Sequence, residues 1–521
     1  MNKKYAHLLF VLPLFALLLA GCASDDSDYG TPGKTYIDLG GIEKSYTIES
    51  FSSQKLSITP TISTSFADDD LEYLWTYYLT SKGNDSHYDA TTNTTTYPKA
   101  DTLSHDRNLD MPVSLADGLY TLIYTVTSKS TGYSQQVVTS LSTASALADG
   151  FYVLKENTEG NTDLDLYHAD KKVLTADVLR TYQGAAMPGA PRSMDLIYEL
   201  PYINGEGNQA TTNALFLATE KDSMRCISLQ SAATVISPVN VHFDNIEGEK
   251  PYRFAHGFWS NFYVTNNGVY NASTNGAGIF GASNGDAGSV FMTVGSGNGF
   301  GAVLYWSDAA HAIEAVNYNG DAMQVGVSKD VADAGFSATL PGAVCLACGH
   351  CENVSGNSYF LLRSRDGAKT YLYTLSSTST KATVESVREV PADSYFAKAT
   401  VRAFNGNTAT IAYAVDGNRL YSYDVAQEAP EKELTLQGIG DGETITYVSN
   451  RYFTGSTPFD YLVVGTQKGT AYRLYFYNII GGEPVGAPVF SFTGEGKMKS
   501  LVYVDHLVSA SDGASFLPVA E

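Results

Sequence analysis

Apolar and polar residues alternate in short runs between residues 35 and 145, which is the period-two pattern of half-buried β-strands. The clearest runs cover residues 71–77 and 118–127, and the first contains Trp75, which we expect in a core. Short strands separated by turns around one central tryptophan are typical of an immunoglobulin-like sandwich. The pattern therefore predicts a sandwich over residues 35–145.

Residues 146–521 repeat a different unit, in which an apolar strand, a tight turn and a second strand rich in Tyr and Leu follow one another. Asp-Gly turns between alternating strands are a strong hairpin signal. The turns fall near residues 157, 222, 267, 308, 366, 416, 468 and 512. This spacing is typical of propeller blades, and we predict a seven- or eight-bladed β-propeller in an all-β chain. The loose repeat leaves a series of separate sandwiches open.

The first residues read as a secretory signal, since Lys3 and Lys4 precede an apolar run over residues 8–20 that is too short to span a bilayer. The segment Leu-Ala-Gly-Cys at 19–22 resembles the lipobox of bacterial lipoproteins. The resemblance implies a signal peptide over residues 1–21 and a lipid on Cys22. The alternative is an ordinary secretory signal with a chance cysteine.

Residues 22–34 are polar and acidic at their start, and we expect a solvated tether there. The segment is similar to the acidic surface-export signal of lipoproteins in the Bacteroidetes. That similarity implies a lipid-anchored protein on the outer face of the outer membrane, with periplasmic facing as the open alternative.

Three segments at 71–75, 118–127 and 150–154 resemble the PKD-like lipoproteins of Bacteroidetes. In that family a PKD-like domain follows the lipid anchor and precedes a large β region. Family members are often encoded beside SusC/SusD-type uptake systems, which implies nutrient capture at the cell surface. The family offers no established activity to carry over.

Charge narrows the choice of partners. The 521 residues carry a formal net charge of −22, which disfavours nucleic acid and anionic lipid surfaces and suits neutral or cationic ligands. The five cysteines, one of them Cys22, are too few for a disulfide scaffold. We expect no cofactor.

One cluster has the residue types of a metal site: Cys345, Cys348, His350 and Cys351. Three thiols and an imidazole could fill a tetrahedral zinc site, but structural zinc usually joins two separated ligand pairs. On a regular strand Cys345 and Cys348 would also point to opposite faces. We therefore expect a disulfide or buried thiols here, without a metal.

Other motifs have simpler explanations. The serine-hydrolase pattern at 281–285 and the dinucleotide-loop pattern at 276–281 lack the strand and helix that such sites need, so we expect a flexible loop over residues 275–301. Residues 364–371 resemble a degenerate Asp-box of sialidase-type propellers, which implies a structural turn. The acidic run at 68–70 is either a Ca²⁺ site or, as we expect, a solvated turn.

Aromatic residues offer the clearest ligand candidates. Trp259, Tyr305 and Trp306 fall in successive repeats, where they could approach one another near a propeller axis. Sugar rings stack on exposed aromatic faces, and core packing is the alternative.

Together these patterns predict a surface lipoprotein that binds a nutrient polymer, a glycan in first place, or scaffolds a SusC/SusD-type uptake complex. We assign no catalytic residue and do not expect an enzyme. A propeller-type glycan hydrolase or lyase, and a protein-interaction platform, stay open as alternatives.

Overall fold

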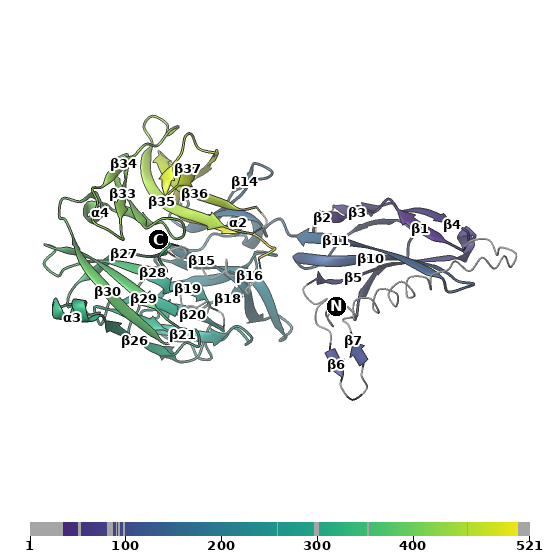
Figure 1. The fold of residues 1–521 in the computed structure, drawn as a ribbon, viewed down its shortest axis with the longest axis horizontal. Coiled ribbons are helices and arrows are strands. Elements are labelled where there is room, and N and C mark those ends of the chain that lie inside the picture. Colours follow the sequence, from purple (N-terminus) through teal and green to yellow (C-terminus); the bar gives the residue numbers. More distant parts are fainter. Residues whose placement is uncertain are drawn as a thin grey trace, which may run out of the picture. The chain divides into compact units, whose positions relative to one another are not determined.

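The computed structural model describes residues 35–50, 54–80, 87–89, 91, 94–96, 99–257, 259–295, 302–351, 354–455 and 457–508 (Figure 1). The predicted signal peptide, Cys22 and the tether lie outside these residues, as does the predicted last turn near residue 512. The chain forms two compact units. Unit 1 contains residues 1–46, 56–111 and 120–141, and unit 2 contains residues 47–55, 112–119 and 142–521.

An immunoglobulin-like sandwich forms in the N-terminal part, as predicted. Its main sheet has the order β2 (Ser45–Glu49), β11 (Ser134–Ala144), β10 (Gly118–Ser128), β5 (Leu71–Leu79), β8 (Asp101–Ser104). Shorter pairs are β1 (Ile37–Gly40) with β4 (Thr61–Thr64), β3 (Lys55–Ile58) with β9 (Leu109–Pro112), and β6 (His87–Asp89) with β7 (Thr94–Thr96). The 3₁₀ turn η1 (Asp68–Asp70) precedes β5.

Trp75 lies in the core of this sandwich, as its alternating strand predicted. It is fully buried, and its ring stacks on Tyr124 at a centroid distance of 4.3 Å. Its indole N–H donates to the backbone oxygen of Asp106 at 3.1 Å, so burial leaves the polar atom satisfied.

Residues 150–504 form a β-propeller of antiparallel four-stranded sheets. The first four groups, in sheet order, are β14 (Val173–Thr175), β13 (Thr162–His168), β12 (Gly150–Glu156), β40 (Lys497–Val504); β15 (Pro191–Ile203), β16 (Gln209–Thr219), β17 (Met224–Ser228), β18 (Thr234–Ile236); β19 (Pro251–His256), β20 (Ser260–Thr265), β21 (Gly268–Ser273), β22 (Ser283–Asn284); and β23 (Met292–Gly295), β24 (Ala302–Ser307), β25 (Ala312–Val316), β26 (Ala322–Val327).

The remaining groups follow the same order. They are β27 (Val344–Cys351), β28 (Asn357–Arg363), β29 (Thr370–Ser377), β30 (Lys381–Val390); β31 (Val401–Phe404), β32 (Ile411–Asp416), β33 (Arg419–Asp424), β34 (Lys432–Leu434); and β35 (Thr444–Phe453), β36 (Phe459–Lys468), β37 (Ala471–Ile480), β39 (Phe490–Glu495), with β38 (Glu483–Pro484) also paired to β37. Within the described residues these groups number seven.

The ring is closed by the two ends of unit 2. The last strand, β40, pairs antiparallel with β12, the first strand of the propeller. Elsewhere a parallel pairing between β26 and β30 joins two neighbouring groups into one eight-stranded sheet. Closure of this kind removes the exposed edge that an open row of sheets would present.

The Asp-Gly hairpins form as predicted. Gly367 lies in the turn between β28 and β29 with φ +70°, and Gly417 lies between β32 and β33 with φ +60°. A left-handed residue is what such turns demand, and glycine adopts it without a steric penalty.

One loop prediction needs correction. The segment 275–301 contains the short edge strand β22 and the strand β23, which its Gly, Ser and Asn content concealed. Ser283 lies within β22, so it is not on a strand-to-helix turn of the kind a hydrolase nucleophile occupies.

Helices are short where they occur: α2 (Val178–Gln183), α3 (Lys329–Asp333) and α4 (Tyr395–Lys398). In the part of the chain that the structure describes, none has the length and apolar character to cross a bilayer.

Candidate functional site

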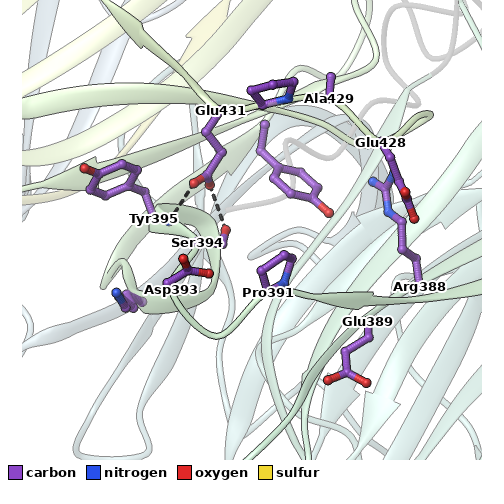
Figure 2. Close-up of a pocket in the computed structure, with 12 residues that line it drawn as sticks. Arg388, Glu389, Pro391, Asp393, Ser394, Tyr395, Glu428, Ala429 and Glu431 are labelled. Carbon is purple, nitrogen blue, oxygen red and sulfur yellow. Dashed lines mark hydrogen bonds between the residues drawn. The ribbon is translucent and has the colours of Figure 1, made fainter.

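A surface cleft of about 810 Å³ lies where the end of β30, helix α4 and the turn between β33 and β34 meet (Figure 2). We call it the α4 cleft. It is lined by Arg388, Glu389, Pro391, Asp393, Ser394, Tyr395, Lys398, Tyr423, Glu428, Ala429, Pro430 and Glu431. Its volume is in the range of small-molecule sites.

One carboxylate fixes the helix that forms a wall of the cleft. Glu431, just before β34, accepts hydrogen bonds from the hydroxyl of Ser394 at 2.7 Å and from the backbone N–H of Tyr395 and Phe396 at 2.8 Å each (Figure 2). These are N–H groups that the first turn of a helix leaves unpaired. The cleft wall is therefore held by a contact between two segments distant in sequence.

Two tyrosines give the α4 cleft its aromatic character. The half-buried Tyr395 stacks on Tyr421 at a centroid distance of 3.7 Å. The Arg388 guanidinium lies 5.2 Å from the ring centre of Tyr423, and its Nη2 donates to the backbone oxygen of Asp424 at 2.7 Å. Burial raises the pKa of Tyr423, so its hydroxyl is a neutral donor near pH 7.

The charge of the lining is negative. Four carboxylates, Glu389, Asp393, Glu428 and Glu431, face two cations, Arg388 and Lys398. Glu431 is occupied by the helix, whereas the other three carboxylates are exposed. Such a cleft favours ligands that are neutral or cationic and disfavours polyanions.

Of the three aromatic residues predicted to bind a ligand, the structure buries two and leaves one exposed. Tyr305 and Trp306 are fully buried, and the Tyr305 hydroxyl donates to Glu314 at 2.5 Å. These two rings have no face for a ligand, which corrects the prediction of stacking for them. Trp259 is 46% exposed in the turn between β19 and β20, so only this ring is available for the stacking that we predicted.

The cysteine cluster lies in the core as free thiols. Cys345, Cys348 and Cys351 are buried in β27, and His350 pairs through Nδ1 with the Ser358 hydroxyl at 3.0 Å. Among the described residues the four do not bring their ligand atoms together as a metal group. Burial raises the pKa of Cys348 to about 12, which disfavours the thiolate that zinc needs.

The prediction that Cys345 and Cys348 point to opposite faces of a strand is wrong. A bulge between Cys345 and Ala347 shifts the register of β27, and Cys345 and Cys348 pack in the same core cluster. An extra residue in a strand reverses the alternation of faces beyond it.

The acidic run of the sandwich closes a turn. Asp70 accepts hydrogen bonds from the Ser128 hydroxyl at 2.6 Å and from the backbone N–H and hydroxyl of Ser130 at 2.9 Å. The Ser128 hydrogen bond is the main reason why the pKa of Asp70 is lowered. This arrangement agrees with the structural-turn interpretation.

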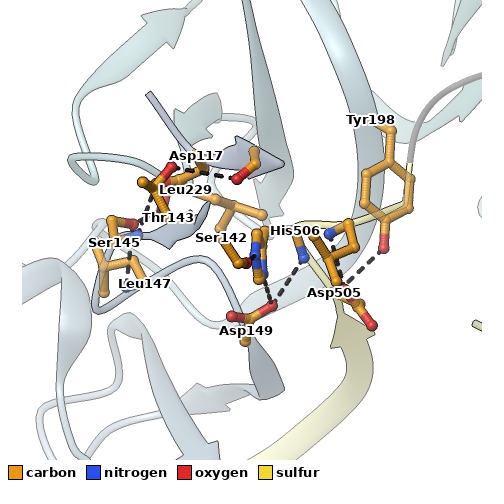
Figure 3. A network of polar contacts seen from close by, with 12 residues as sticks. Asp117, Ser142, Thr143, Ser145, Leu147, Asp149, Tyr198, Leu229, Asp505 and His506 are labelled. Carbon is orange, nitrogen blue, oxygen red and sulfur yellow. Dashed lines mark hydrogen bonds and ion pairs between the residues drawn. The ribbon is translucent and has the colours of Figure 1, made fainter. Parts of the chain in front are cut away.

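A second polar constellation lies within unit 2 (Figure 3). His506 follows β40, and its Nδ1 lies 2.7 Å from Oδ1 of Asp149, just before β12. Its Nε2 lies 3.0 Å from the hydroxyl of Ser142 in β11. We call Ser142, His506 and Asp149 the His506 relay. Burial lowers the pKa of His506, but the hydrogen bond and charge of Asp149 outweigh it and the net shift is upward.

A metal is a poor fit to this constellation. Asp149, Asp505 and His506 do bring ligand atoms within 4.8 Å of one another. However, His506 Nδ1 is hydrogen-bonded to Asp149, and Asp505 accepts the backbone N–H of Leu507 at 2.8 Å. A raised imidazole pKa favours the proton, which competes with a metal for the same lone pair.

No sequence motif marks either site. The cleft joins residues 388–398 to residues 423–431, and Ser142 and His506 are 364 positions apart. Only the strand order brings these residues together.

Comparison with known families gives a match in the N-terminal part of the chain. A model of the PKD-like family matches residues 25–191, which covers the predicted sandwich and continues to the start of β15. None of the curated proteins matches the chain.

Solved structures give distant likenesses. A quinonprotein alcohol dehydrogenase-like protein from Bacteroides thetaiotaomicron is 11% identical with a TM-score of 0.37, over 90% of this chain and 99% of that one. A protein of unknown function from Bacteroides caccae is 9% identical with a TM-score of 0.31, over 68% and 99%. BamB from Moraxella catarrhalis is 10% identical with a TM-score of 0.23, over 60% and 91%. The propeller assignment rests on the strand pairing described above.

Proposed function

We propose that the protein binds a nutrient polymer, a glycan in first place, and that the α4 cleft is where it does so. The observation that carries this proposal is the cleft itself, whose lining includes two tyrosines, a guanidinium and three exposed carboxylates. Ligand sites typically combine apolar walls with a few polar groups that fix orientation.

The chemistry of the lining suits a sugar. A pyranose presents an apolar C–H face, for which Tyr395 offers a half-buried ring, and hydroxyl groups that carboxylates and guanidinium groups can bind. Because carboxylates outnumber cations, a neutral glycan or one with amino groups is favoured over a uronic-acid polymer.

The lipobox resemblance at Cys22 supports attachment to a membrane. We propose a lipid anchor there, a location on the outer membrane facing the exterior, and a PKD-like sandwich that acts as a spacer. An anchored binding protein raises the local concentration of polymer near a transporter of the SusC/SusD type, which is how it would support uptake.

The test uses soluble protein from residue 23 onward, incubated with a panel of plant, host and microbial polysaccharides. We expect retention on at least one neutral or amino-bearing glycan, without release of products. Release of sugar fragments would contradict a binding role and favour the hydrolase or lyase alternative. Retention on none of them, with co-purification of an outer-membrane protein, would favour the protein-interaction alternative.

A matched pair of variants locates the site. Tyr395→Ala removes the half-buried ring of the α4 cleft, while Tyr182→Ala removes a 46% exposed ring from α2, outside the cleft. We expect the first to weaken retention about tenfold, as loss of an aromatic contact does, and the second to leave it unchanged. Equal retention by both variants would exclude the α4 cleft as the glycan-binding site.

A further inference from the structure

The His506 relay is not part of the α4 cleft and needs its own explanation (Figure 3). Its three side chains come from three places in unit 2: Ser142 near the end of β11, Asp149 before β12 and His506 after β40. They form one continuous chain of contacts, 3.0 Å from Ser142 Oγ to His506 Nε2 and 2.7 Å from His506 Nδ1 to Asp149 Oδ1.

Asp149 sets the direction of the hydrogen bonds. Its Oδ1 also accepts the backbone N–H of His506 at 2.8 Å, so the carboxylate is held against the ring edge that carries Nδ1. A carboxylate can only accept, so Nδ1 must carry a proton. In the neutral imidazole Nε2 is then an acceptor, and the Ser142 hydroxyl is the group that donates to it.

We propose that Ser142 is a nucleophile, activated by His506 and positioned through Asp149, that takes acyl groups from small neutral or cationic esters. A hydroxyl hydrogen-bonded to a base, with the base oriented by a third group, is the arrangement that makes serine reactive. The contact geometry of Ser142, His506 and Asp149 is independent of the serine-hydrolase pattern around Ser283, which lies in an edge strand.

The chemical step balances within these residues and water. Ser142 Oγ bonds to the acyl carbon while His506 Nε2 takes the hydroxyl proton. The bond to the leaving alcohol breaks, and the alkoxide receives that proton from Nε2. Water then attacks the acyl-serine by the same proton path, which releases the carboxylic acid and restores Ser142. Asp149 stabilises the imidazolium that forms in both halves.

Access and charge limit the substrate. Ser142 is partly exposed, so a small ester can approach its hydroxyl. Asp117 and Asp505 both act electrostatically on His506 and add negative charge around the relay. Anionic esters are therefore disfavoured.

The first experiment labels the full soluble chain with a fluorophosphonate probe at mildly alkaline pH and maps the adduct by peptide mass spectrometry. The reaction forms a bond from Ser142 Oγ to phosphorus and releases fluoride, so it needs no knowledge of the natural ester. An adduct on Ser142 supports the proposal. An adduct elsewhere, or none, overturns it. Because the labelling uses the unaltered protein, the result does not depend on whether a variant folds.

The second experiment measures hydrolysis of 4-nitrophenyl acetate. Ser142→Ala should lose at least about tenfold in rate, whereas Ser140→Ala, an exposed serine on the same strand, should not change. Thermal unfolding of each variant reports whether it is folded. Equal rates in the two variants would overturn the proposal.

A pH profile separates a chemical role from a structural one. The rate should rise as His506 loses its proton, and Asp149→Asn should move the midpoint to lower pH as well as lower the rate, because the carboxylate that raises the pKa of His506 is gone. A midpoint that stays in place would contradict the role of Asp149.

Discussion

At the scale of single residues, the buried side chains of Asp195 and Arg253 form an ion pair in unit 2. Asp195 accepts hydrogen bonds from Nε of Arg253 at 3.0 Å and from Nη2 at 2.6 Å, and both side chains are almost fully buried. Asp195 also accepts the backbone N–H of Phe254 at 2.8 Å, which ties β15 to β19. Loss of one partner in such a pair leaves a buried charge without compensation.

We therefore expect Asp195→Ala to lower the free energy of unfolding by about 3 kcal/mol, measured by urea denaturation. The exposed pair of Lys329 and Asp333 in α3 is the matched control. Asp333→Ala should cost less than about 0.5 kcal/mol because water screens that pair. Similar costs for both changes would refute this ranking.

The raised pKa of Asp117 predicts how the stability of the protein depends on pH. Burial raises the pKa of Asp117 from 3.8 to about 6, against the lowering effect of the Ser145 backbone N–H. The folded state then binds more protons than the unfolded state between these values, so stability falls as pH rises from about 4 to 6. His506 has a raised pKa, and its contribution is present below 6.5 and is lost as pH rises through the folded-state value.

Asp117→Asn should remove the fall in the free energy of unfolding that Asp117 causes as pH rises. After allowance for partial exposure, we expect this fall to be about 1–2 kcal/mol between pH 4 and pH 7. Urea denaturation across that range measures it. A slope that persists unchanged in the variant would show that other groups carry the dependence.

At the scale of elements, turn chemistry is the part of the fold that sequence predicts well. The Asp-Gly pairs at 366–367 and 416–417 are hairpin turns because glycine fits the left-handed conformation there. A Cβ on Gly417 would meet nothing within 4 Å, so conformational strain is the whole cost of adding one.

Gly417→Ala should consequently destabilise unit 2 by about 1 kcal/mol. Gly281 has open space around it and no left-handed φ, so Gly281→Ala is the matched control and should be nearly neutral. Thermal unfolding of both variants gives the comparison, and equal shifts in Tm would mean that the turn is not strained.

Other elements were beyond sequence reasoning for physical reasons. The bulge at Cys345 inverts the faces of β27 without any change in composition. The alternation of faces in a regular strand therefore put Cys348 on the wrong face. Strands β22 and β23 lie in a Gly- and Ser-rich run that resembles a loop. Trp306 satisfies the pattern of a sugar-stacking residue and of a core residue equally, and only its burial decides.

At the scale of the whole molecule, the candidate sites depend on how distant segments meet. The α4 cleft needs β30, α4 and the β33–β34 turn, and the His506 relay needs the two ends of unit 2. The propeller could be predicted from the repeat, but which turns adjoin could not, because the sequence spacing does not encode the order of packing.

Closure of the ring gives a prediction at this scale. A chain that ends at residue 496 lacks β40 and leaves β12 with an open edge, and the buried residues Leu501 and Val504 are lost from the core. We expect it to aggregate or to unfold well below the temperature of a control that ends at residue 508. Identical unfolding temperatures would show that closure contributes little.

Binding of glycan in the α4 cleft can be measured by one titration. Calorimetric binding of the glycan retained most strongly in the panel should be measured for the unaltered protein, Tyr395→Ala and Tyr182→Ala. We expect Kd to rise about tenfold in Tyr395→Ala alone. An unchanged Kd in Tyr395→Ala, with the protein folded, would contradict it.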